Sequence, residues 1–224
     1  MSSTSSRRSL EPPQSKKELE ILLEGLEPHP HPEVLLEQYS LPAVNAAEIL
    51  WNAQLRYGDI AGRVVLDLGC GTGILAIGAA LLGASRVIGV DVDCSALKVA
   101  MRNALRKRVC SVDWICGDAR SLPLRERVDT VVQNPPFGVK KRGADTVFLE
   151  AALSIGEVVY SIHKAGESNR RFLEQFIERI GGRITDVYPI RIRLPPTYPF
   201  HHKRAHFVDA EVYRIIRRRK GETA

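Results

Sequence analysis

Short apolar runs alternate with helically patterned segments after Gly62, and this alternation is the signature of a parallel sheet covered on both faces. It predicts strands at 63–68, 86–91, 111–116, 128–133 and 157–162, with helices at 73–82, 94–107, 145–153 and 167–180. Gly181 and Gly182 can end the last helix with a left-handed cap. Two further strands, 183–192 and 206–216, are expected to pair as an antiparallel hairpin. The expected fold is therefore α/β, with a seven-stranded, mostly parallel sheet and helices on both faces.

The segment before the core is patterned differently. Residues 1–15 are rich in Ser and Pro and predict a disordered tail, because they offer almost no large apolar side chains to bury. Leucines recur at helical spacing from Lys16 to Gly25 and predict a first helix. A second helix is expected at 43–56, with a buried stripe formed by Val44, Ala47, Ile49, Leu50 and Leu55. The chain thus divides into a tail (1–15), a helical segment that packs on the core (16–60) and a core domain (61–220).

Composition adds limits on the class of protein. The 224 residues, 44% of them hydrophobic, suffice for one globular core, and no run approaches the roughly 18 apolar residues of a membrane span. A cytoplasmic protein is expected. The cysteines form no C-x-x-C pair and have no His at zinc-ligand spacing, which favours reduced, packed thiols and no metal site at Cys70, Cys94, Cys110 and Cys116. The net charge of +6 favours a polyanionic partner, although many basic proteins bind no nucleic acid.

A glycine-rich turn joins the first core strand to its helix. Gly69, Gly71 and Gly73 allow a tight turn and bring backbone amides close to a ligand. About twenty residues later the second strand ends in Asp91, which is placed to accept hydrogen bonds from a ribose diol. This spacing predicts an adenosine-containing cofactor. Ile74 occupies the position of the third glycine in a nicotinamide fingerprint, which disfavours that cofactor; a turn that merely permits close packing is the alternative.

The fourth core strand ends in Asn134-Pro135-Pro136-Phe137, at the sheet edge where doubly wound folds bind ligands. An adenine N6 amine is a poor nucleophile, because its lone pair is delocalised into the ring. The Asn134 side-chain oxygen and the Pro135 carbonyl could each accept one of its N–H bonds and favour a pyramidal nitrogen. The prolines stiffen the loop, and Phe137 offers a flat surface on which a flipped base can stack. An ordinary turn after a strand is the alternative.

Several segments together resemble one methyltransferase family: LLEQYSLP at 35–42, DLGCGTGIL at 67–75, NPPFGVK at 134–140, GADTVFLEAAL at 143–153, YSIHK at 160–164 and YPFHHKRAHFVDAEVYRI at 198–215. The chain resembles the class I, Rossmann-like amino-methyltransferases with an NPPF motif, and among them the methyltransferase-like five family of ribosomal RNA adenine-N6 methyltransferases. The resemblance implies S-adenosylmethionine as cofactor and an adenine in RNA, most simply small-subunit ribosomal RNA, as substrate.

The resemblance also implies roles for individual residues. Asp67 would organise the loop at the methionine end, and Asp118 and Ala119 would hold the adenine ring. The remaining cofactor contacts would come from Gln38, Thr72, Ile74 and Asn134. Leu41 departs from the family pattern, which usually has Thr there, so no cofactor contact is assigned to it.

Three basic groups follow strand ends, and we expect them to surround the pocket and bind RNA phosphates. They comprise Lys140, Lys141 and Arg142, then His163 and Lys164, and then His201, His202, Lys203 and Arg204. Solvated surface charge is the alternative. The family further implies a small zinc-binding activator protein as partner, which could pair with strand 111–116 if that strand lies at the sheet edge. Two other functions stay open: a protein glutamine-N5 methyltransferase and a non-catalytic RNA-binding scaffold.

Overall fold

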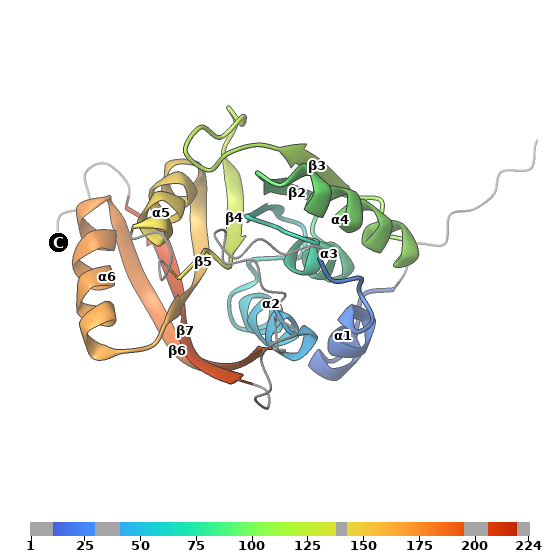
Figure 1. Ribbon diagram of the computed structural model, residues 1–224, viewed down its shortest axis with the longest axis horizontal. Coiled ribbons are helices and arrows are strands. Elements are labelled where there is room, and N and C mark those ends of the chain that lie inside the picture. Colours follow the sequence, from blue (N-terminus) through green and yellow to red (C-terminus); the bar gives the residue numbers. More distant parts are fainter. Residues whose placement is uncertain (1–10, 30–40, 138–142, 195–205, 219–224) are drawn as a thin grey trace, which may run out of the picture.

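The computed structural model describes residues 11–29, 41–137, 143–194 and 206–218, and Figure 1 shows its arrangement. A seven-stranded sheet has the order β3-β2-β1-β4-β5-β7-β6. The first five strands of this order are parallel neighbours, whereas β7 is antiparallel to both β5 and β6. The strands are β1 (Val64–Leu68), β2 (Arg86–Asp91), β3 (Val112–Cys116), β4 (Val128–Gln133), β5 (Gly156–Lys164), β6 (Gly182–Leu194) and β7 (His206–Arg217). The predicted parallel core and C-terminal hairpin are confirmed.

Helices cover both faces of the sheet and create two cores (Figure 1). The helices are α1 (Lys16–Leu23), α2 (Ala43–Tyr57), α3 (Ile74–Leu81), α4 (Cys94–Arg106), α5 (Ala144–Ile155) and α6 (Glu167–Arg179). The first three pack on one face, and α5 and α6 pack on the other. Successive residues of β1 enter opposite cores, Val65 with α3 and Leu66 with α5, which explains the unbroken apolar run. None of the described helices is long and apolar enough to cross a membrane.

The buried stripe of α2 differs from the predicted one. Val44 is 45% exposed and Leu55 is 71% exposed. The helical period places both on the side opposite to Ile49, Leu50 and Ala53, which are buried. The prediction was therefore wrong for Val44 and Leu55 and right for Ala47, Ile49 and Leu50.

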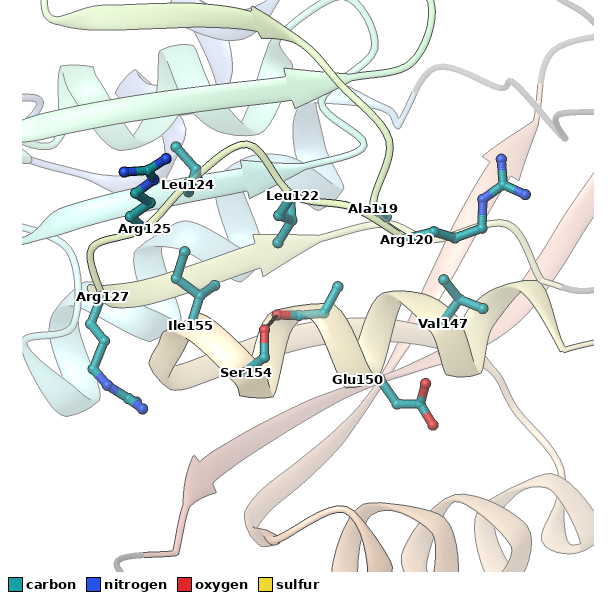
Figure 2. A pocket seen from close by; sticks show the side chains of 11 residues that line it. Ala119, Arg120, Leu122, Leu124, Arg125, Arg127, Val147, Glu150, Ser154 and Ile155 are labelled. Carbon is teal, nitrogen blue, oxygen red and sulfur yellow. Dashed lines mark hydrogen bonds between the residues drawn. The ribbon is translucent and has the colours of Figure 1, made fainter.

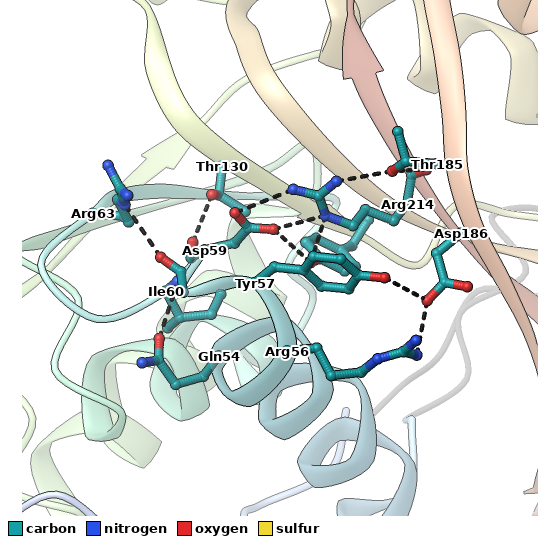
Figure 3. Close-up of polar contacts among 12 residues, drawn as sticks. Gln54, Arg56, Tyr57, Asp59, Ile60, Arg63, Thr130, Thr185, Asp186 and Arg214 are labelled. Atoms are coloured by element: carbon teal, nitrogen blue, oxygen red, sulfur yellow. Dashed lines mark hydrogen bonds and ion pairs between the residues drawn. The ribbon is translucent and has the colours of Figure 1, made fainter.

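A buried ion pair ties the connection between α2 and β1 to the sheet (Figure 3). The Asp59 Oδ2 atom accepts hydrogen bonds from the Tyr160 hydroxyl (2.6 Å) and from Arg214 Nε (2.9 Å). Thr130 donates to the Asp59 carbonyl oxygen (2.6 Å), and the Arg214 guanidinium lies 4.1 Å from the centre of the Tyr57 ring. These contacts connect the N-terminal helical segment to β4, β5 and β7. Loss of one partner would leave an uncompensated buried charge.

The cysteines do not all match the prediction of reduced, packed thiols. Cys94 and Cys116 form a disulfide with a Cα–Cα distance of 5.5 Å. Cys94 begins α4 just after β2 and Cys116 ends β3, so the neighbouring parallel strands bring them to the same sheet edge. Cys70 is a buried free thiol as expected, but Cys110 is exposed. The sequence spacing alone could not reveal this pairing, because it depends on the strand order.

Candidate cofactor and substrate site

The glycine-rich turn lies at the carboxyl end of β1. The amides of Gly69 and Cys70 both donate to the Val90 carbonyl, at 2.8 and 3.0 Å, and fold the turn against β2. Gly71 and Gly73 have φ angles of 51° and 88°, in the left-handed region that favours glycine. No described residue lies within 4 Å of where a Cβ atom on Gly71 would stand, so the described part of the chain leaves this side of the turn uncovered. The turn thus presents bare backbone to a ligand.

Asp91 stands at the end of β2, beside this turn. Its Oδ2 accepts from the Gly71 amide (2.7 Å) and its Oδ1 from the Asp93 amide (2.9 Å). A carboxylate oxygen can accept two hydrogen bonds, so each oxygen keeps capacity for one hydroxyl of a ribose diol. Burial raises the pKa of Asp91. The geometry fits the predicted ribose contact.

Asp67 joins the strand to the helix beneath the turn. It is 1% exposed, and its Oδ2 accepts from the Ala76 amide (2.8 Å) in the first turn of α3. Burial raises the pKa of the Asp67 carboxyl to about 8. Asp67 therefore fixes how the glycine turn enters α3 rather than facing solvent.

The predicted adenine contacts lie at the next strand end. Asp118 follows β3 and pairs with Arg120 (Nη2–Oδ2 2.5 Å), while the Gly117 amide donates to the Asp91 carbonyl (2.9 Å). Val92, directly after Asp91, is 55% exposed. A planar apolar ring next to Val92 would cover this surface, so the residues present fit an adenosine group. Val92 is therefore a further candidate contact, which the sequence analysis did not name although it directly follows Asp91.

Asn103 on α4 connects the glycine turn to the N-terminal segment and was also missed. Its Nδ2 donates to the carbonyls of Thr72 and Glu27, both at 3.0 Å, and its Oδ1 accepts from the Glu27 amide (2.8 Å). Nearby, His29 Nε2 lies 2.8 Å from Asp93 Oδ2. A fully buried asparagine on the apolar stripe of α4 was the available signal. These contacts place the end of the described N-terminal segment beside the carboxyl end of β2, where Asp91 lies.

The Asn134-Pro135-Pro136-Phe137 motif follows β4, which is the other neighbour of β1. Leu68 and Gln133 are register partners, so the two residues that follow them, Gly69 and Asn134, begin their turns side by side. Asn134 is half-buried, and Phe137 packs partly on the core. The strand order therefore brings the glycine turn and the predicted amine-binding motif together at the carboxyl ends of β1 and β4.

The basic residues predicted to bind RNA differ in their exposure to solvent, and most of them lie outside the described residues. Lys164 is exposed at the end of β5. His163 is 1% exposed, and burial lowers its pKa to about 3, so the ring is neutral and shielded from solvent. The predicted phosphate contact of His163 was therefore wrong. Eight other predicted site residues lie outside the described residues: Gln38, Lys140, Lys141, Arg142, His201, His202, Lys203 and Arg204.

A groove of about 460 Å³ runs along α5 from Ala119 to Arg127 (Figure 2). Its cationic side chains are partly balanced, because Arg120 pairs with Asp118 and Arg127 pairs with Glu157. Glu150 adds a negative charge to the wall. The remaining cation, Arg125, is matched in number by Glu150, so the groove carries little net positive charge for binding a phosphate backbone.

The chain is similar to known proteins along most of its length. The family model for ribosomal protein L11 methyltransferase (PrmA) matches residues 52–135, which span the cofactor side of the site. An uncharacterised protein of Methanocaldococcus jannaschii is 41% identical, over 89% of this chain and 93% of its own. The crystal structure of a candidate RNA methyltransferase of Pyrococcus horikoshii superimposes with a TM-score of 0.84 and 40% identity, covering 92% of this chain and all of that one.

The parallel sheet, the glycine turn and the acidic strand ends define a class I S-adenosylmethionine-dependent methyltransferase. The Drosophila melanogaster rRNA N6-adenosine-methyltransferase Mettl5 is 34% identical over 204 residues, which cover 89% of this chain and 95% of the relative. The chain belongs to the METTL5 family of methyltransferases.

Proposed function

We propose that this protein acts in the cytoplasm and transfers a methyl group from S-adenosylmethionine to the exocyclic N6 amine of an adenine in small-subunit ribosomal RNA. The pairing of Leu68 with Gln133 carries the proposal, because it sets Asn134 beside the glycine turn at one sheet edge. The zebrafish relative METTL5, named as an rRNA N6-adenosine-methyltransferase, is 35% identical over 88% of this chain and supports the same substrate class.

Catalysis by this site consists mainly of positioning. Bound S-adenosylmethionine supplies a methyl group on a positively charged sulfur. The Asn134 side-chain oxygen and the Pro135 carbonyl each accept one N–H of the adenine amine, which turns the nitrogen lone pair outward. Pro136 restricts the backbone of the loop, and Phe137 stacks on the extruded base, a contact worth roughly 1–3 kcal/mol in single-stranded complexes.

The chain's own groups hold cofactor and RNA. Asp91 accepts the ribose hydroxyls, and Asp118 and Ala119 meet the adenine edge. Gln38, Thr72 and Ile74 complete the cofactor contacts. RNA phosphates are bound by Lys164 together with Lys140, Lys141, Arg142, His201, His202, Lys203 and Arg204, because basic side chains gain by displacing counterions.

A small zinc-binding activator protein is the proposed partner, and it pairs with β3. This strand lies at one edge of the sheet, so it offers unpaired backbone groups along its outer side. Helix α4 packs beside β3 and exposes two large apolar side chains, Met101 at 50% and Leu105 at 69%. The open edge of β3 suits a partner that adds a strand, and a partner that also reached the outer side of α4 would cover these two apolar side chains.

The proposed function is tested by incubating the protein with methyl-labelled S-adenosylmethionine and purified small-subunit ribosomal RNA, followed by digestion to nucleosides. We expect label in N6-methyladenosine and none with large-subunit RNA. Label found only in protein would favour a glutamine-N5 methyltransferase. Cofactor binding without any transfer would favour a non-catalytic RNA-binding scaffold.

A further inference from the structure

Three polar side chains lie buried directly behind the Asn134 motif. Gln133, Ser161 and His163 are 1%, 0% and 1% exposed. Buried strands of a parallel sheet are normally apolar, and a polar group removed from water is destabilising unless it is paired. Within the residues that the structure describes, the Gln133 Oε1 atom has no hydrogen-bond partner, so this cluster is not simply a well-satisfied part of the core.

The backbone register brings the three side chains into a row. Gln133 on β4 and Ser161 on β5 are register partners, and Gln133 Nε2 donates to Ser161 Oγ (2.9 Å). Ser161 and His163 are two residues apart on β5 and therefore share one face of the sheet. The Ser161 Oγ and His163 Nε2 atoms are 2.7 Å apart. On its far side, His163 Nδ1 lies 3.9 Å from Asp145 Oδ2, in the first turn of α5.

The directions of these hydrogen bonds follow from the donors available. An amide nitrogen only donates, so Ser161 Oγ is the acceptor toward Gln133, and its own proton is free for His163 Nε2. Burial lowers the pKa of His163 to about 3, so the ring carries a single N–H. With Nε2 accepting, that proton resides on Nδ1 and faces the Asp145 carboxylate. The N–H and O–H donors of the row thus all point in one direction, from Gln133 toward Asp145.

We propose that Gln133, Ser161 and His163 are positioning residues that fix the Asn134 motif for methyl transfer. Gln133 directly precedes Asn134, and Asp145 lies eleven residues after Asn134 in the next helix. The row therefore extends from the residue before the Asn134 motif to within 3.9 Å of the helix that follows the motif. This inference rests on the proposed function, since it assigns the row a part in placing those acceptors.

Positioning of this kind has a large expected effect on turnover. A displacement of about 1 Å in a group that aligns reactants can lower the rate about 100-fold. None of the three residues is exposed enough to touch RNA or cofactor in this conformation. Their loss should therefore lower kcat and leave KM for RNA and the cofactor Kd nearly unchanged.

The test compares four variants of the full chain. Ser161→Ala removes the middle of the row, and His163→Leu removes its end while it keeps an apolar side chain of similar size. His163→Gln restores an acceptor near the Nε2 position. Tyr213→Phe is the matched control. The Tyr213 ring packs edge-on against the His163 ring, with 5.6 Å between the ring centres, but the Tyr213 hydroxyl donates to Glu211, which lies outside the row.

We expect Ser161→Ala and His163→Leu to lower kcat at least about 10-fold, with KM and cofactor Kd within about threefold of wild type. His163→Gln should recover most of the loss, and Tyr213→Phe should resemble wild type. Wild-type kcat in Ser161→Ala, or no advantage of Gln over Leu at position 163, would overturn the inference.

A second measurement needs no substrate. The ¹⁵N NMR signal of the Asn134 side-chain amide should move in Ser161→Ala and His163→Leu but not in Tyr213→Phe. An unmoved signal in the first two variants would refute the positioning role. If the wild-type protein methylated no RNA, the proposed function would fail, and this signal would still decide whether the row fixes Asn134.

Discussion

Asp67 is a carboxyl group held in the core with one backbone hydrogen bond, from Ala76. Burial raises its pKa from 3.8 to about 8. A carboxyl whose folded-state pKa lies above the unfolded value makes the folded state bind its proton more tightly. Folding stability therefore falls as the pH rises from about 4 to about 8 and then levels off. The buried Asp67 carboxyl therefore lowers folding stability at neutral pH, while its hydrogen bond to Ala76 fixes the turn between β1 and α3.

Asp67→Asn removes that titration while it keeps an oxygen acceptor for the Ala76 amide. In the absence of cofactor, the variant should gain stability relative to wild type as the pH rises between 4 and 8, by at most about 1.4 kcal/mol per pH unit. Urea unfolding at pH 5, 7 and 8.5 measures this difference. Asp113→Asn, at an exposed carboxylate, controls for the loss of one charge. If the difference in the free energy of unfolding between Asp67→Asn and wild type did not vary with pH, the raised pKa of Asp67 would be contradicted.

At the scale of elements, β3 is the strand whose surroundings suggest an incoming partner. It occupies the sheet edge, and α4 beside it exposes Met101 and Leu105. One face of β3 already packs within the protein, because the Trp114 ring lies against Gly73 and Gly89 at the base of the glycine turn. A partner on this edge would thus bind next to an element that supports the cofactor turn.

Leu105→Glu should abolish co-purification with a co-expressed zinc-binding activator, because a charge would be buried in an apolar interface. Leu55→Glu is the matched control: Leu55 is 71% exposed, against 69% for Leu105, but lies on α2. Pull-down of the activator by each variant provides the measurement. Equal capture by both variants would exclude the α4 surface from the interface.

At the scale of the whole molecule, the strands and helices were predictable because both faces of the parallel sheet are covered. Val65 and Leu66 enter opposite cores, so β1 reads as an unbroken apolar run that ends at a glycine. The same logic located Asp91 and Asn134, since each directly follows or ends such a run. Local pattern was therefore sufficient to predict that the glycine turn, Asp91 and Asn134 share one edge of the sheet.

Features that depend on how elements pack against one another could not be predicted from that pattern. The bond between Cys94 and Cys116 requires β2 and β3 to be neighbours, and no local signal encodes that order. His163 looked like a basic group at a strand end, but the Tyr213 ring of β7 and Asp145 of α5 lie against its side chain. The place of Asn103 on the apolar stripe of α4 indicated a buried asparagine, but its partners Glu27 and Thr72 are distant in sequence and emerge only from the packed structure.

We propose that Asn134 presents an adenine amine to a cofactor held by the neighbouring glycine turn. Single-turnover methyl transfer to small-subunit ribosomal RNA by Asn134→Ala, measured beside the cofactor Kd, tests it most directly. We predict a rate at least about 100-fold below wild type with the Kd within about fivefold, and near wild-type behaviour in Asn52→Ala on α2. Full transfer by Asn134→Ala, or a loss explained entirely by weaker cofactor binding, would show that Asn134 does not present the amine.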